Sequence, residues 1–232
     1  VILLPQYYYF DESMIYGDER ILSRSEFFEQ LRTRRAYTSG VNPALVREKF
    51  EDALKDGKDI LCITVSSGLS GSYDTIYMVA LYLKGMYPAR SIEVIDSLSA
   101  TLASGFLCMD ALEMKKQGKT LQETSEEIKK RVHRIDVYFV VDNFKYLVQG
   151  GRVSEAVGKI GDILDIKLIL TMKNGRIEPY RKNRGMNHAL RNIRNIAQSK
   201  ETSRLGAIYV GNTDMFNKCK SFVSIDCEAD LN

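Results

Sequence analysis

The stretch Ile60–Ala80, ILCITVSSGLSGSYDTIYMVA, decides the fold. Its opening run Ile60–Val65 is almost wholly apolar, which is typical of a parallel strand buried on both faces. A serine- and glycine-rich loop follows over Ser66–Ser72, and a helical pattern begins at Tyr73. Ligands bind beyond the carboxyl ends of parallel strands, where helix N-termini favour anions. The stretch therefore predicts a parallel α/β domain whose loop cradles a phosphate or a carboxylate, or else a capped turn without a ligand.

The remainder of the first half alternates strands with helices. Two capping boxes, Ser23 with Glu26 and Thr120 with Glu123, each predict the start of a helix. Alternation of this kind predicts a three-layer α/β/α domain with a parallel sheet, and we place it at residues 1–132. Asp96 ends a strand and is expected to cap the next helix. The other expected elements are strands at Val1–Phe10 (with a proline that allows an edge position) and Ser91–Ile95, and helices at Ala44–Leu54, Tyr73–Leu83 and Ser99–Gln117.

The second half has a different pattern. Asn174-Gly175 lies between two strand-like runs and is a strong signal for a hairpin. We therefore expect an α+β domain with a mixed sheet at residues 133–232. Its expected elements are strands at Val137–Val141, Ile166–Met172, Arg176–Arg181 and Leu205–Val210, a short helix broken by Gly150-Gly151-Arg152, and a helix at His188–Lys200.

Charge and composition exclude several classes of protein. The net charge of +3 is too small to argue for nucleic acid, although residues 150–200 hold 11 Lys/Arg against 4 Asp/Glu. Such a basic face could meet an acidic partner or phosphates, or simply be solvated. No apolar run approaches the ~18 residues that span a membrane, and no signal peptide is visible, so we expect a cytoplasmic protein. The chain begins inside a strand-like run, and we expect residues before Val1 to be missing.

Catalytic and metal-binding motifs are missing from the sequence. The Ser66–Ser72 loop is neither a P-loop nor a GxGxxG loop, and no GxSxG elbow occurs. A nucleophilic serine needs a base, and the two histidines, His133 and His188, stand in charged or polar helical contexts. The cysteines form no CxxC pair, so neither a metal nor a cofactor is expected. A hydrolase or transferase with Ser66 as nucleophile, and a phosphate- or sugar-binding module, remain alternatives.

Five motifs, which follow one another along the chain in the order of the family, resemble the DegV family. VSSGLSGSYDT is similar to the family pattern SSxLSGTY, EVIDSLSATLASG to VIDSxxxSxGxG, and YFVVDNFKYLVQGGRVS to FxxxxLxYLxxGGRIS. IKLIL with IEPYRKNRG resembles IKPILxxxxGxxxPxxKxRG, and Thr38-Ser39 falls at the TSxP motif. The similarity extends from Leu4 to Val210.

The resemblance implies a non-enzymatic bacterial carrier with two α/β domains. A tunnel between them would hold a long-chain fatty acid, which the carrier would present to a separate fatty acid kinase. The carboxylate would be bound by Thr38 and Ser66. The other implied ligand residues are Ser39, Ser67 and Gly68, together with Arg152 and Arg184 near the tunnel mouth.

The chain departs from the family pattern in four places. The family's DSTxDL motif would precede Val1, and its GTHxGPG segment is absent. Leu168 replaces the proline of IKPIL, and the TSxP proline is displaced to Pro43.

Overall fold

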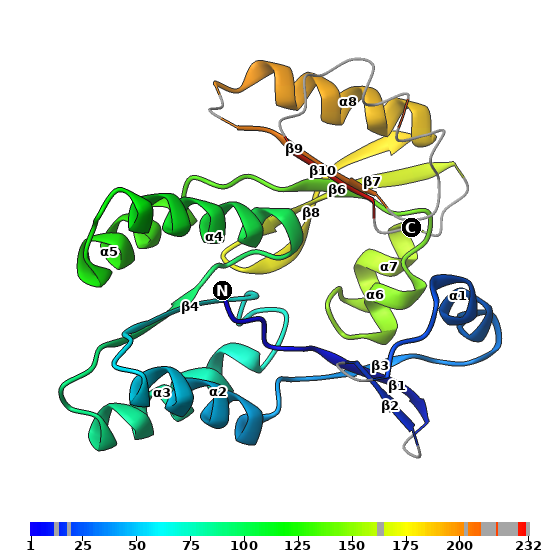
Figure 1. Ribbon diagram of the computed structural model, residues 1–232. Helices are drawn as coiled ribbons and strands as arrows, with labels where there is room; N and C mark the ends of the chain where they lie inside the picture. The colour runs from blue at the N-terminus through cyan, green and yellow to red at the C-terminus, as the bar shows by residue number, and fades with distance from the viewer. Residues whose placement is uncertain are drawn as a thin grey trace. The chain divides into compact units, whose positions relative to one another are not determined.

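The computed structural model describes residues 1–11, 14–17, 20–161, 165–201, 204–209, 217 and 227–230, with backbone only at 160–161 and 227–230. The chain forms two compact units, Val1–Ser97 with Leu107–Arg131, and Leu98–Phe106 with Val132–Asn232 (Figure 1). Parallel and antiparallel sheets both occur with helices around them, which confirms the predicted α/β class. The domain boundary at residue 132 stays a prediction, because a compact unit need not fold alone.

The first unit begins with a small antiparallel sheet. The strands are β1 (Tyr7–Asp11), β2 (Met14–Tyr16) and β3 (Tyr37–Ser39), in the order β2-β1-β3. The expected strand at Val1–Phe10 was wrong for its first part, because the described strand starts only after Pro5, which has no N–H to donate to a ladder. An edge position was also wrong, since β1 is the middle strand.

Helix α1 (Arg24–Thr33) covers this sheet. Its predicted capping box is confirmed, with the Ser23 N–H donating to Glu26 Oε2 at 2.8 Å. Aromatic rings join the helix to the strands, since Tyr8 stacks on Tyr16 and meets Phe27 edge-on at 5.2 Å between ring centroids. Phe10, Tyr16 and Leu31 are buried in the resulting cluster.

The parallel strands predicted from the deciding stretch are confirmed. Strands β4 (Ile60–Thr64) and β5 (Ile92–Asp96) pair in parallel, with Ile60 opposite Ile92 and Thr64 opposite Asp96. Two helices, α2 (Pro43–Lys55) and α3 (Ser72–Met86), cover one face. The core there contains Val46, Phe50, Leu54, Ile76, Ala80, Leu83 and Ile92, all buried.

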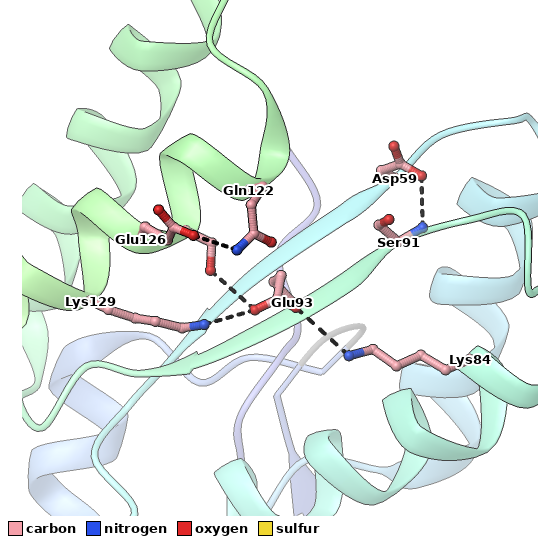
Figure 2. A network of polar contacts seen from close by, with 8 residues as sticks. Asp59, Lys84, Ser91, Glu93, Gln122, Glu126 and Lys129 are labelled. Atoms are coloured by element: carbon pink, nitrogen blue, oxygen red, sulfur yellow. Dashed lines mark hydrogen bonds and ion pairs between the residues drawn. The ribbon is translucent and has the colours of Figure 1, made fainter.

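The opposite face of the β4–β5 pair meets α5 (Leu121–Val132), which follows α4 (Thr101–Lys116). Glu93 alternates with Ile92 and Val94 along β5 and so lies on the other face of the strand, where only the long side chain of Lys84 reaches it from α3, at 3.8 Å. Its carboxylate accepts from Ser125 Oγ at 3.1 Å and Lys129 Nζ at 2.9 Å, both on α5 (Figure 2). Helices therefore lie on both faces of this pair, in three layers as predicted (Figure 1).

The second unit is built on the predicted hairpin. Strands β6 (Tyr138–Val140), β7 (Ile166–Lys173) and β8 (Arg176–Arg184) form an antiparallel sheet in that order. The hairpin closes with Lys173 opposite Arg176, and Asn174 and Gly175 have φ of 49° and 77°, which the tight turn requires.

Helices cover both faces of this sheet. Helix α8 (Met186–Ser199) packs Ala189 and Ile196 against Ile169. Helices α6 (Lys145–Gln149) and α7 (Glu155–Gly161) lie on the other face, where Phe144 and Val153 pack on Leu168 and Leu170. Strands β9 (Gly206–Tyr209) and β10 (Cys227–Asp230) pair in parallel as a separate two-stranded sheet. Among the described residues, every helix is too short or too polar to cross a bilayer.

Candidate functional site

Ser66 lies two residues beyond the carboxyl end of β4, the position that the sequence predicted for an anion site. Its side chain is fully buried. The Ser66 hydroxyl accepts the Gly68 N–H at 3.1 Å, and the Ser66 carbonyl accepts the N–H groups of Leu69 and Ser70 at 3.0 and 3.1 Å. These bonds wind the loop into a tight turn around Ser66. A hydroxyl has one proton and two lone pairs, so the Ser66 side chain can both donate and accept hydrogen bonds.

Asp96 holds the next residue of the loop. The Ser67 N–H donates to the Asp96 carboxylate, with its two oxygens at 3.2 and 3.3 Å. Two of the backbone donors expected in the anion cradle, the N–H groups of Ser67 and Gly68, therefore already have protein acceptors. The Ser67 hydroxyl is exposed, whereas the Ser66 hydroxyl is buried.

Ser72 connects this loop to the segment that carries Thr38. The Val41 N–H donates to the buried Ser72 Oγ at 3.4 Å, and Ser72 Oγ lies 2.9 Å from Ser70 Oγ. A methyl group at Gly40 would stand 3.7 Å from the same oxygen. Two hydroxyl-bearing segments that are about 30 residues apart in the sequence thus meet at the start of α3.

Thr38 and Ser39 face opposite sides of β3, because side chains alternate along a strand. Thr38 pairs with Tyr8 of β1 and Ser39 with Tyr7. Both side chains are exposed. Gly40 follows two residues after Thr38, on the side that an extended chain shares with Thr38, and Gly40 is next to Ser72. This alternation favours Thr38 over Ser39 as the residue that accompanies Ser66.

The surroundings of the loop disfavour ionisation of the Tyr73 hydroxyl. Burial raises the pKa of the Tyr73 hydroxyl, and the nearby Asp96 carboxylate raises it further. Tyr73 is the second residue of α3, directly after the loop. Its phenol therefore stays neutral at physiological pH and can only donate or accept a hydrogen bond.

Arg152 and Arg184 belong to the second unit. Arg152 follows the end of α6, where its backbone N–H donates to Leu147 O at 3.0 Å and its guanidinium donates to Gly150 O. Arg184 ends β8 opposite Ile166. Both side chains are exposed, and their part in ligand binding stays a prediction.

The structure also places the residues on which the alternatives to an anion loop depend. His133 and His188 both belong to the second unit and are exposed, and the first unit, which holds Ser66, contains no histidine. In the part of the chain that the structure describes, no three or more His, Cys, Asp or Glu side chains gather as metal ligands. An open hollow of about 260 Å³ lies over α1, and its two glutamates oppose a carboxylate ligand. Its lining is Leu22, Glu26, Glu29, Gln30, Thr33 and Arg34.

Sequence reasoning missed two parts of this site. It gave Asp96 only a helix-capping role, whereas the carboxylate binds the loop, and it gave no role to Ser72. The pairing of Thr64 with Asp96 is the signal that could have found Asp96, because it sets the end of β5 beside the start of the loop.

The comparisons with known proteins agree on one family. The sequence model described as "Uncharacterised protein, DegV family" matches residues 1–228. A DegV domain-containing protein of Caldanaerobacter subterraneus is 30% identical over 218 residues, which are 92% of this chain and 76% of that protein. One of Clostridium acetobutylicum is 35% identical over 154 residues, 66% of this chain. That match spans about half of the relative's length, 54%.

Solved structures share the fold. A DegV lipid-binding protein of Thermotoga maritima has a TM-score of 0.77 at 26% identity, over 98% of this chain and 82% of its own. The fatty acid kinase B3 protein of Streptococcus pneumoniae, solved with linoleic acid, has a TM-score of 0.84 at 20% identity, over 98% and 83%. With a family match over nearly its whole length, the chain belongs to the DegV family.

Proposed function

We propose that this chain is a carrier that binds a long-chain fatty acid and holds its carboxylate at the Ser66 loop. The observation that carries the proposal is the meeting of the two hydroxyl-bearing segments through the bond from Val41 N–H to Ser72 Oγ. Family membership supplies the class of ligand, since the related proteins of known structure are described as binding lipid or linoleic acid.

The chemistry of the loop suits a carboxylate. An unpaired carboxylate is costly to bury, so its oxygens need donors. In this proposal the hydroxyls of Thr38, Ser66 and Ser67 would supply them, without a catalytic base. The loop is therefore a binding element in this proposal, and Ser66 is not a nucleophile.

The acyl chain supplies most of the binding free energy. Burial of ~15 CH₂ groups at ~0.8 kcal/mol each contributes at most ~12 kcal/mol. Loss of translational, rotational and chain freedom opposes this by several kcal/mol. A ligand held in this way survives purification, so the protein is expected to carry fatty acid when it is isolated from cells.

We extend the proposal to a partner kinase that phosphorylates the presented carboxylate in the cytoplasm. The structural likeness to the Streptococcus pneumoniae fatty acid kinase B3 protein supports this extension. The excess of basic residues over 150–200, which includes the exposed Arg152 and Arg184, offers a surface for an acidic or nucleotide-bearing partner. Charge reversal at these two arginines should slow association with the kinase.

The test of the binding proposal compares Ser66→Ala and Thr38→Val with the parent chain. Each variant removes a hydrogen bond to a charged group, so fatty-acid affinity should fall by about 1–3 kcal/mol. Titration of delipidated protein with palmitate measures it. Ser125→Ala is the matched control, because Ser125 is also a fully buried serine of the first unit but bonds Glu93 instead. Unchanged affinity in both site variants would refute the head-group assignment. If solvent extraction of the purified protein released a polar phosphate compound and no fatty acid, that compound would be the ligand instead.

A further inference from the structure

Helix α3 has a row of large apolar side chains on its outer face. Its inner face, with Ile76, Ala80 and Leu83, packs into the core of the first unit. The outer side chains recur at spacings of three and four residues, so they share one face of the helix. Each is between 46% and 62% exposed, and they are Tyr77, Met78, Leu81, Tyr82 and Met86. The sequence has no charged residue between Asp74 and Lys84, so the centre of this face is uncharged.

An exposed apolar face of this extent is typical of an interaction surface. At ~100 Å² for each half-exposed side chain, the five side chains together present roughly 500 Å². Contiguous apolar patches of that area are at the upper end for monomeric proteins and are often functional. Tyrosine and methionine are also enriched at the centres of protein interfaces, where charged residues are depleted. The composition of this face therefore fits a protein partner.

The cations that border this face are paired with carboxylates. Arg47 of α2 lies over the Tyr82 ring at 5.0 Å and donates to Glu51 at 2.9 Å. Lys84 Nζ lies 3.8 Å from Glu93 (Figure 2). Helices that bind membrane surfaces are rich in Lys and Arg, which attract anionic lipids. Because both cations here have acidic partners, the surface suits a protein with an apolar face better than an anionic membrane.

The row is complementary to itself in an antiparallel pair of helices. A two-fold axis at the middle of the row would place Tyr77 of one copy opposite Met86 of the other, and Met78 opposite Gly85. Gly85 is exposed, and the space around an added Cβ is open, so it leaves a recess for the Met78 side chain. Contact between a tyrosine ring and a methionine sulfur is favourable. Self-complementarity of this kind is what a two-fold interface requires.

We propose that the outer face of α3 is a dimer interface, packed antiparallel against α3 of a second copy of this chain. The pair would bury on the order of 1,000 Å² in all, which is close to the lower limit for a specific interface. The dimer is therefore expected to be weak, with a dissociation constant in the micromolar range. The inference is independent of the proposed fatty-acid site, because none of these side chains belongs to that site.

Sedimentation velocity of the whole chain between ~1 and ~200 µM tests the proposal. The parent chain should shift from the mass of one copy towards that of two as its concentration rises. Met78→Glu should weaken this association at least about tenfold, because a charge in the centre of the face would lose its water. Met109→Glu is the matched control, since Met109 is 50% exposed on α4 of the same unit, and its association should equal that of the parent chain. Circular dichroism checks that both variants fold.

Gly85→Leu separates the antiparallel pair from general adhesion between apolar surfaces. It adds an apolar side chain to the face, so general adhesion would become stronger. In the proposed pair it fills the recess opposite Met78, so association should instead fall at least about tenfold. A parent chain that stays monomeric, stronger association of Gly85→Leu, or equal weakening by Met109→Glu would overturn the proposal. Binding of the parent chain to phosphatidylcholine vesicles that Met78→Glu abolishes would assign the face to a lipid surface instead.

Discussion

Glu93 should stabilise the first unit by about 1 kcal/mol, and Glu93→Gln removes its charge with little change of shape. Its carboxylate accepts from Ser125 Oγ at 3.1 Å and from Lys129 Nζ at 2.9 Å, and Lys84 Nζ lies at 3.8 Å (Figure 2). The Lys129 side chain is 52% exposed, so water screens the ion pair and limits it to a few tenths of a kcal/mol. The hydrogen bond from fully buried Ser125 contributes the remainder, because a bond to a carboxylate is stronger than the bond that the amide oxygen of a glutamine still accepts.

The contribution of Glu93 depends on pH in a definite direction. Burial acts to raise the pKa of this carboxyl, but the hydrogen bond and charge of Lys129, with help from Ser125 and Lys84, outweigh burial and lower the pKa. The folded pKa is then below the unfolded value of about 4.3. Stabilisation by Glu93 is therefore complete above that value and is lost as the pH falls through the lower folded pKa.

Urea unfolding followed by circular dichroism measures this effect. At pH 7 Glu93→Gln should unfold about 1 kcal/mol more easily than the parent chain, and the difference should shrink below pH 4. Glu126→Gln is the control, since Glu126 is an exposed neighbour on α5 that bonds only Gln122 among the contacts described here, and its effect should stay within ~0.5 kcal/mol. Equal stability of Glu93→Gln and parent at pH 7, or a difference that persists at pH 3, would refute the reasoning.

Two further predictions concern the core and one turn. Leu83→Ala should lower the free energy of unfolding by about 2–5 kcal/mol, because Leu83 is fully buried between α3 and β5. Leu81 lies on the same helix but is 54% exposed, so Leu81→Ala should lower it far less. Equal losses in urea unfolding would contradict the described orientation of α3. Gly185→Ala should cost about 1–3 kcal/mol through backbone strain alone, since Gly185 has φ of 74° and ψ of 157° with nothing within 4 Å of an added methyl. Gly85→Ala, inside α3 with equal space, should instead raise the melting temperature.

Local signals in the sequence were enough for most elements. The apolar runs at Ile60–Val65 and Ser91–Ile95 are within a residue of β4 and β5, and Asn174-Gly175 marks the hairpin turn. The Thr120 capping box is confirmed, with its N–H 2.9 Å from Glu123 Oε2. These features depend on residues a few positions apart, so the spacing of residues in the sequence is enough to predict them.

The missed elements depend on distant partners. Strand β3 is only three residues long, and it exists because Tyr37 and Thr38 pair with Tyr9 and Tyr8 almost 30 residues earlier. The same limit applies to the site. Its serines could be named from the loop, but the bond from Ser67 N–H to Asp96 joins residues 29 apart, and it is the strand register that creates it.

The division of binding energy between chain and head group determines which experiment is decisive. If burial of the acyl chain contributes up to ~12 kcal/mol before ordering costs, a lost hydroxyl worth ~1–3 kcal/mol leaves most of the affinity in place. Ser66→Ala would then still be purified with lipid bound, so the presence of lipid cannot report on the head-group assignment. Only a measured dissociation constant can do so, and a clear increase of that constant for Ser66→Ala beside an unchanged value for Ser125→Ala would show that the loop recognises the carboxylate rather than the chain.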